Sequence, residues 1–342
     1  MHPSFDIGLT TLPAYFTLLM VGFTLAILWA HHEGMRRGLE GNAILDLGLL
    51  MLACGLIGAR ALHILADGQF WDYVHLCTDP NQVAGLPLGR GLRCAADDQC
   101  LTAGLGDLCE TATGLCRQRQ DCLRVLKIWY GGYAYYGGFL LAVPTGLWFL
   151  RKRGLPMWRV ADLAGFAIAF GLVFGRMGCF LAGCCFGATT QGPFGIAFPR
   201  YSPAWDKHLE QHRIAENAIT SLPVHATQLY EAIACTAIFA WCYWRYRRGP
   251  RFEGQVFFQF MAAYAVFRFA VEFMRADDRG EWLGGLTTSQ WISVPLFAWS
   301  AWVLACGRAW PEVAASSAVG PETKARRAHA APDAPDPGGD GG

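Results

Sequence analysis

Three cysteines and an arginine occur together in an otherwise apolar run, GRMGCFLAGCCFG, which spans residues 175–187. The thiols belong to Cys179, Cys184 and Cys185, and the arginine is Arg176. Clustered thiols are typical of metal sites, of redox pairs or of small buried apolar side chains. Arginine is typical of phosphate binding, because its planar guanidinium donates two parallel hydrogen bonds. The run alone leaves open whether the chemistry belongs to the thiols or to the arginine.

Ionisable side chains also occur within other apolar stretches, where each costs at least about 2.5–3.5 kcal/mol to insert. The candidates are Asp46, Arg60, Asp162, Arg176, Glu231, Arg268, Glu272 and Arg275. Asp46, Asp162 and Arg275 lie near the ends of these stretches, so we interpret them as groups that reach the interface. Arg268 and Glu272 are four residues apart and share one helix face. They form either an internal ion pair or part of a cationic pocket for an anionic lipid head group.

The composition indicates the element that positions these groups, a membrane helix. Of the 342 residues, 53% are hydrophobic and only 16% are charged, against about a quarter charged in soluble proteins. About 20 apolar residues cross a bilayer as a helix. Seven stretches qualify, namely Leu12–Ala30, Ala43–Leu65, Tyr133–Leu150, Val160–Leu181, Thr227–Tyr243, Gln255–Met274 and Ser289–Cys306. We expect an all-α polytopic membrane bundle of about seven transmembrane helices, and a net charge of +1 gives no sign of nucleic-acid binding.

The distribution of Lys and Arg predicts the orientation of the bundle. These residues gather after the first, third and fifth stretches and in the C-terminal tail. Such loops are cytoplasmic by the positive-inside rule, which leaves the N-terminus and the alternate loops outside.

A polar loop after the second stretch holds six cysteines, at positions 77, 94, 100, 109, 116 and 122. Six cysteines in an oxidising space predict a disulfide-rich extracytoplasmic insert of unknown pairing, with a zinc site as the alternative. The predicted organisation is membrane spans one and two in 1–66 and the insert in 67–127. Spans three to seven follow in 128–308, with an external loop at 187–224 and a disordered cytoplasmic tail at 309–342.

Several short motifs, in order along the chain, resemble the bacterial prolipoprotein diacylglyceryl transferases. The pieces are Tyr15, Arg60, the double glycines Gly131-Gly132 and Gly137-Gly138, Asp162, GRMG with the closing Gly187, HATQLYE, RFAVEFMR and SQWISVP. Together they cover nearly the whole membrane portion. The glycine pairs suggest a backbone that bends or opens to a ligand.

The resemblance implies transfer of the diacylglyceryl group of phosphatidylglycerol to the thiol of a lipobox cysteine, with glycerol phosphate leaving. The partners are then phosphatidylglycerol and the signal peptides of prolipoproteins, in the bacterial inner (cytoplasmic) membrane as a multi-pass protein. No metal or cofactor is expected. The implied phosphatidylglycerol-binding residues are Arg176, Tyr15, Arg60 and Gly187. The implied catalytic residues are Tyr136, Arg268, Glu231 and Glu272.

The sequence departs from the family pattern at two places. Tyr136 replaces a histidine before the second double glycine, and tyrosine is a poor base near neutral pH. In the family signature GRxxNFxNxExxG, Cys179, Ala182 and Cys184 replace Asn, Asn and Glu. The alternatives to a transferase are a membrane thiol–disulfide oxidoreductase and an inactive relative that binds lipid or signal peptides. The string LAGC at 181–184 looks like a lipobox, but we interpret it as a coincidence because it ends an internal span.

Overall fold

The computed structural model describes residues 4–6, 11–66, 70–79, 83, 94–102, 108–110, 114–117, 122–126, 133–275 and 285–307. Most of these residues are helical, which confirms the all-α prediction. Each of the seven apolar stretches is a helix, namely α1 (Ala14–Arg36), α2 (Gly41–Ala66), α5 (Tyr135–Arg153), α6 (Met157–Ala182), α8 (Thr227–Arg247), α9 (Gln255–Glu272) and α10 (Thr288–Cys306). The predicted tail at 309–342 lies outside the described residues.

Within the described part of the chain, three helices are long and apolar enough to cross a membrane, namely α1, α2 and α6. The other four are shorter or carry more charge. Helix α5, for example, ends in Arg151, Lys152 and Arg153. The chain is therefore a helical membrane protein with at least these spanning candidates.

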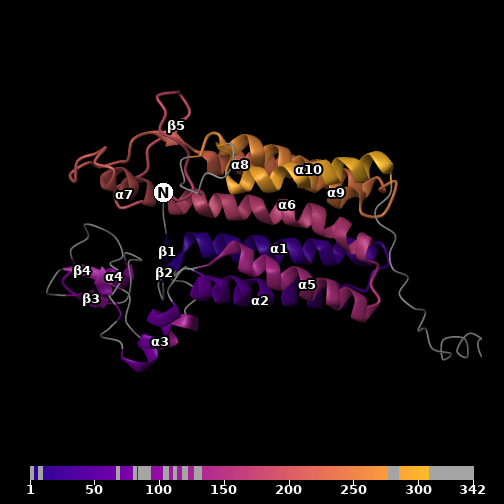
Figure 1. The fold of residues 1–342 in the computed structure, drawn as a ribbon, viewed down its shortest axis with the longest axis horizontal. Helices are drawn as coiled ribbons and strands as arrows, with labels where there is room; N and C mark the ends of the chain where they lie inside the picture. The colour runs from indigo at the N-terminus through magenta and orange to yellow at the C-terminus, as the bar shows by residue number, and fades with distance from the viewer. Residues whose placement is uncertain are drawn as a thin grey trace, which may run out of the picture. The chain divides into compact units, whose positions relative to one another are not determined.

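The long helices lie alongside one another in two groups (Figure 1). Helix α5 packs on α2, and α8, α9 and α10 lie with α6, while α1 lies between the two groups and packs more extensively on α6 than on α2. Glycines permit the close contact of α2 and α5, since a Cβ atom on Gly137 would lie 2.2 Å from the carbonyl oxygen of Gly58. Gly137 and Gly138 therefore serve helix packing, not the expected bend or ligand opening. Gly131-Gly132 lies outside the described residues.

A buried core lies near the α5–α6 and α8–α9 loops, with contributions from both groups of helices. Leu163, Phe166 and Val256 are buried there, together with Cys242 and Tyr246. Apolar faces from α6, α8 and α9 meet at these residues, and their removal from water stabilises the bundle.

Asp162 lies in the same region. The sequence analysis placed its side chain at the membrane interface, and that prediction is wrong. Its side chain is only 2% exposed. The carboxylate accepts backbone N–H groups from Gly254 at 2.9 Å, Val256 at 2.8 Å and Phe257 at 3.1 Å. It therefore caps the N-terminus of α9, where the helix dipole favours an anion.

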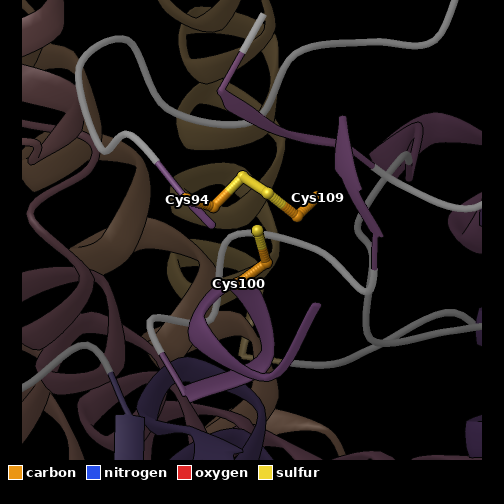
Figure 2. A group of neighbouring side chains, drawn as sticks. All are labelled: Cys94, Cys100 and Cys109. Atoms are coloured by element: carbon orange, nitrogen blue, oxygen red, sulfur yellow. A yellow bond between two sulfur atoms is a disulfide. The ribbon is translucent and has the colours of Figure 1, made fainter. Parts of the chain in front are cut away.

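The Cys-rich insert consists of short elements: α3 (Phe70–Thr78), α4 (Asp97–Thr102), β3 (Leu108–Glu110), β4 (Leu115–Arg117) and the 3-10 helix η2 (Cys122–Leu126). Its six cysteines form the disulfides 77–122, 94–109 and 100–116. Figure 2 shows the 94–109 bond, with the sulfur of Cys100 directed toward it. Because these sulfur atoms are used in disulfides, the zinc alternative has no thiolates here.

A second set of short elements joins α6 to α8 at the same end of the bundle as the insert (Figure 1). It contains the β5–β6 pair (Gly195–Ile196 with Val224–His225) and helix α7 (Pro203–Glu210). Phe198 and Trp205 are buried within it. A short hairpin of β1 (Ser4–Asp6) and β2 (Thr11–Pro13) precedes α1. The α6–α8 segment fixes how α6 ends and how α8 begins, and both termini carry candidate site residues.

Candidate functional site

The centre of the site is a buried carboxylate that binds two arginines. Glu231, in the second turn of α8, is fully buried. One carboxylate oxygen lies 2.7 Å from the Arg176 guanidinium and the other lies 2.8 Å from that of Arg275. The Arg176 side chain is 19% exposed, and that of Arg275 is 2% exposed. The cluster carries one more positive than negative charge, in a place where water screens it little.

A second ion pair lies on α9, as the four-residue spacing predicts. Arg268 and Glu272 are 2.7 Å apart, with side chains 10% and 2% exposed. Arg268 also donates a hydrogen bond to the hydroxyl of Ser289 at the start of α10, at 3.1 Å. Tyr264 of α9 interacts electrostatically with both Arg176 and Arg268. The two predicted guanidinium groups therefore share a neighbour at one end of the bundle.

The three thiols of the opening run lie beside this cluster. The sulfur atoms of Cys179, Cys184 and Cys185 are all within 4.8 Å of one another, and all three thiols are free. Hydrogen bonding from Cys179 and Cys184 lowers the pKa of Cys185, and Arg275 and Arg176 add to this effect. The structure therefore places thiols and arginines in one site.

Gly187 and Tyr15 complete the immediate surroundings. A Cβ atom on Gly187 would lie 2.4 Å from the carbonyl oxygen of Met274. Only glycine allows this approach, which holds the chain next to Arg275. Tyr15 packs against Gly178 of α6 and interacts electrostatically with Arg176 and the thiols. Both residues therefore lie with Arg176, as the sequence suggests.

Arg60 and Tyr136 have different surroundings from the cluster. Arg60 is 7% exposed and donates to the carbonyl oxygens of Arg124 at 2.8 Å and Val125 at 3.3 Å, which attaches the insert to α2. Tyr136, at the start of α5, is 48% exposed, and its ring packs edge-on against that of Tyr135. Arg60 therefore links α2 to the insert, and the Tyr136 side chain is accessible at the start of α5.

An apolar surface groove of about 570 Å³ runs along α10. Its lining includes Thr288, Trp291, Ile292 and Pro295. Thr288 adjoins Ser289, the hydrogen-bond partner of Arg268. The groove is thus an apolar surface of α10 that begins at the same end of the helix as Ser289, and such a surface suits acyl chains.

Arg275 is the site residue that the sequence analysis misplaced. We interpreted it as an interfacial group because it lies near the end of an apolar stretch. Its side chain is in fact nearly inaccessible and bound to Glu231. The signal was present in the run RFAVEFMR, which ends at Arg275.

These features define a helical membrane protein with arginine–carboxylate clusters buried at one end of its bundle. A family model described as prolipoprotein diacylglyceryl transferase matches residues 114–306. The phosphatidylglycerol–prolipoprotein diacylglyceryl transferase of Stenotrophomonas maltophilia is 32% identical over 59% of this chain and 71% of its own length. Those of Polynucleobacter asymbioticus and Solidesulfovibrio magneticus are 33% and 34% identical, with 64% of each relative covered. The chain belongs to the prolipoprotein diacylglyceryl transferase family.

Proposed function

We propose that the protein transfers the diacylglyceryl group of phosphatidylglycerol to the cysteine thiol of a prolipoprotein lipobox. The observation that carries this proposal is the pair of arginines on Glu231, since that cluster has an excess positive charge in a buried place. Fixed cationic donors stabilise the negative charge that a leaving phosphate gains. Family membership and the names of the relatives support the same reaction.

In the reaction, the thiol sulfur attacks the glycerol carbon that bears the phosphate. A carbon–sulfur bond forms, the carbon–oxygen bond to phosphate breaks, and the glycerol phosphate leaves with the electron pair. The thiol must lose its proton first, because the thiolate is the nucleophile. The protein must therefore both neutralise the leaving group and favour the thiolate.

Arg176 is the proposed head-group ligand, since it is the more accessible arginine of the cluster. Glu231 acts as a positioning residue, because both of its oxygens are occupied by guanidinium groups. Arg268 supplies a second cation, which Glu272 holds in place. The acyl chains lie in the groove along α10, which begins at Thr288, next in sequence to the Arg268 partner Ser289.

The remaining predicted residues have weaker roles. Tyr15 and Gly187 shape the pocket around Arg176, and Arg60 acts on lipid binding through the position of the insert. Tyr136, whose surroundings differ from those of the Arg176 cluster, guides the incoming lipobox peptide along α5. Its exposure on α5 is consistent with a substrate that arrives from the lipid side.

We further propose that all seven long helices cross the bacterial inner membrane, with the N-terminus and the insert outside and the C-terminus in the cytoplasm. The arginines at the ends of α1, α5 and α8 favour that orientation. Disulfides in the insert favour an oxidising space for it.

The test uses purified full-length protein in liposomes that contain phosphatidylglycerol, together with a lipobox peptide. We expect release of glycerol phosphate and a peptide mass increased by one diacylglyceryl group. A matched peptide with serine in place of the lipobox cysteine should give neither product. A folded sample that binds lipid and peptide without turnover would instead identify an inactive binding relative.

A further inference from the structure

Three free thiols converge where helix α6 ends. Cys179 lies in its last turn, and Cys184 and Cys185 follow its C-terminus at Ala182. All three sulfur atoms are within 4.8 Å of one another. Three sulfurs around a zinc ion, each about 2.3 Å from it, lie about 3.8 Å apart. The spacing in the structure is therefore close to that of a three-thiolate metal site.

The backbone that carries these thiols is held by side chains of α8. Gly183 ends α6 in a left-handed conformation at φ 71°, and Cys185 also has a positive φ of 60°. Such a φ is uncommon for a residue other than glycine. Thr227 donates to the carbonyl oxygen of Cys185 at 2.8 Å, and Gln228 donates to that of Cys184 at 2.6 Å. Both donors are fully buried, so the turn is fixed before any ligand binds.

The neighbouring charges suit a divalent ion. Three thiolates around one Zn²⁺ carry one net negative charge, whereas three around Cu⁺ carry two. The cluster of Arg176, Glu231 and Arg275 carries one net positive charge beside the thiols. Zn²⁺ therefore leaves the smaller net charge on three thiolates, and burial disfavours net charge. A redox pair would need only two thiols and would leave one without a role.

We propose that Cys179, Cys184 and Cys185 bind one zinc ion and that its open fourth position accepts the lipobox thiol of the substrate. Zinc sites with three protein ligands keep one position for water or substrate. A thiol bound to such an ion loses its proton. The second half of this proposal rests on the proposed function; the zinc site itself does not.

The zinc site also gives this chain a way to form the substrate thiolate that does not depend on Tyr136. Cys179, Cys184 and Cys185 would hold the ion, and the ion would supply a thiolate at neutral pH, with the thiol proton passing to water. The sulfur would then form its bond to the glycerol carbon as the carbon–oxygen bond to phosphate breaks, with Arg176 next to the departing phosphate. No electron is gained or lost, and a thioether product would be a weaker ligand than a thiolate.

The first experiment measures zinc in the purified full chain, produced without a histidine tag, by elemental mass spectrometry. We expect about one zinc per chain in the wild type and a loss of it in Cys179→Ser, Cys184→Ser and Cys185→Ser. Cys54→Ser and Cys306→Ser remove free thiols elsewhere and should retain the zinc. Zinc that persists in the three site variants is an adventitious ion only, and overturns the proposal.

A second measurement keeps the test valid if a variant fails to fold. In the wild type, zinc should protect the three thiols from maleimide, and a chelator should expose them. A disulfide among the three, or labelling that zinc does not change, contradicts the site.

The claim that the lipobox thiol binds the metal is tested on protein that contains Co²⁺ in place of zinc. A lipobox peptide should strengthen the sulfur-to-cobalt charge-transfer absorption, because a fourth thiolate joins the metal, and a serine peptide should not. If cobalt binds and the peptide changes nothing, thiol activation is wrong. Metal binding with the peptide response but without glycerol phosphate release would instead contradict the proposed transfer reaction.

Discussion

Buried carboxylates lie toward both ends of helix α6, but they are neutralised in different ways. Asp162, near the start of α6, accepts three backbone N–H groups of the α8–α9 loop and α9. Close to the end of α6, Glu231 of α8 binds Arg176 and Arg275. Asp162 and Arg176 are 14 residues apart, or about 21 Å along a helix.

The difference indicates which end is built for a ligand. Three backbone N–H groups stabilise the Asp162 carboxylate where it is buried. This end of α6 therefore contributes to the stability of the fold. At the Glu231 end, two cations share one anion, and this excess is costly inside a protein unless an anion from outside joins it. The first end contributes stability, and the second keeps an unbalanced charge for binding.

The largest effect is expected from Arg176→Ala. Removing one preorganised donor to a developing charge lowers the rate by about 10²- to 10³-fold. Glycerol phosphate release from phosphatidylglycerol liposomes measures the effect. Arg159→Ala is the matched control, since Arg159 forms an exposed pair with Glu253 and its loss should leave the rate unchanged. Equal rates in the two variants would contradict the proposed difference between the Asp162 and Glu231 ends of α6.

Arg268→Lys should have a smaller effect on the same assay. Lysine keeps the charge, but its side chain is shorter and differently shaped, so it reaches Glu272 and Ser289, which one Arg268 nitrogen contacts, less well. Loss of one hydrogen bond to a charged group costs about 1.5–3 kcal/mol, or about 10- to 160-fold in rate. A lysine variant with the wild-type rate would assign Arg268 a purely structural role.

Asp162→Asn should lower stability and leave the chemistry intact. The neutral amide accepts the N–H groups of Gly254, Val256 and Phe257 less strongly than the carboxylate does. We expect a loss of about 1–3 kcal/mol, seen as a lower melting temperature in detergent. The rate per folded molecule should not change. A rate loss as large as that of Arg176→Ala would show that both ends serve catalysis.

The smallest expected effect is a loss of stability at acid pH in the segment between α6 and α8. Burial lowers the pKa of His208, and Arg213 and Lys207 lower it further. The neutral ring accepts the backbone N–H of Leu222 at 3.2 Å. Because the folded pKa lies below the unfolded value of about 6.5, this contribution is present above that pH and is lost as the pH falls. After correction for the intrinsic pH dependence of amide exchange, protection in 195–222 should fall at acid pH in the wild type but not in His208→Gln, and an identical change in the two would exclude His208.

The helices could be predicted from the sequence, because long apolar runs leave the backbone no other way to satisfy its N–H and C=O groups in lipid. Arg268 and Glu272 could also be paired, since both lie on one helix. The pairing of Glu231 with Arg275 could not, because it joins residues 44 apart. The same is true of the contact between Gly58 and Gly137, which depends on how two helices cross.

The convergence of the three thiols could not be predicted either, although they lie close together in the sequence. Cys179 and Cys184 are five residues apart, so in an unbroken helix their sulfurs would point to different faces. The end of α6 at Ala182 and the left-handed turn at Gly183 bring them together. The sequence contains that glycine, but the buried Thr227 and Gln228 that hold the turn come from a distant helix.

Native mass spectrometry of bound lipid tests the central claim most directly, namely that the Glu231 cluster binds the anionic head of phosphatidylglycerol. The wild type, Arg176→Ala and Arg247→Gln are compared after reconstitution in phosphatidylglycerol and phosphatidylethanolamine. Arg247 is the matched residue, because it pairs with buried Glu33 in the same half of the bundle as Asp162. We predict that the wild type and Arg247→Gln retain phosphatidylglycerol and that Arg176→Ala loses it. Equal retention in all three proteins would contradict the account.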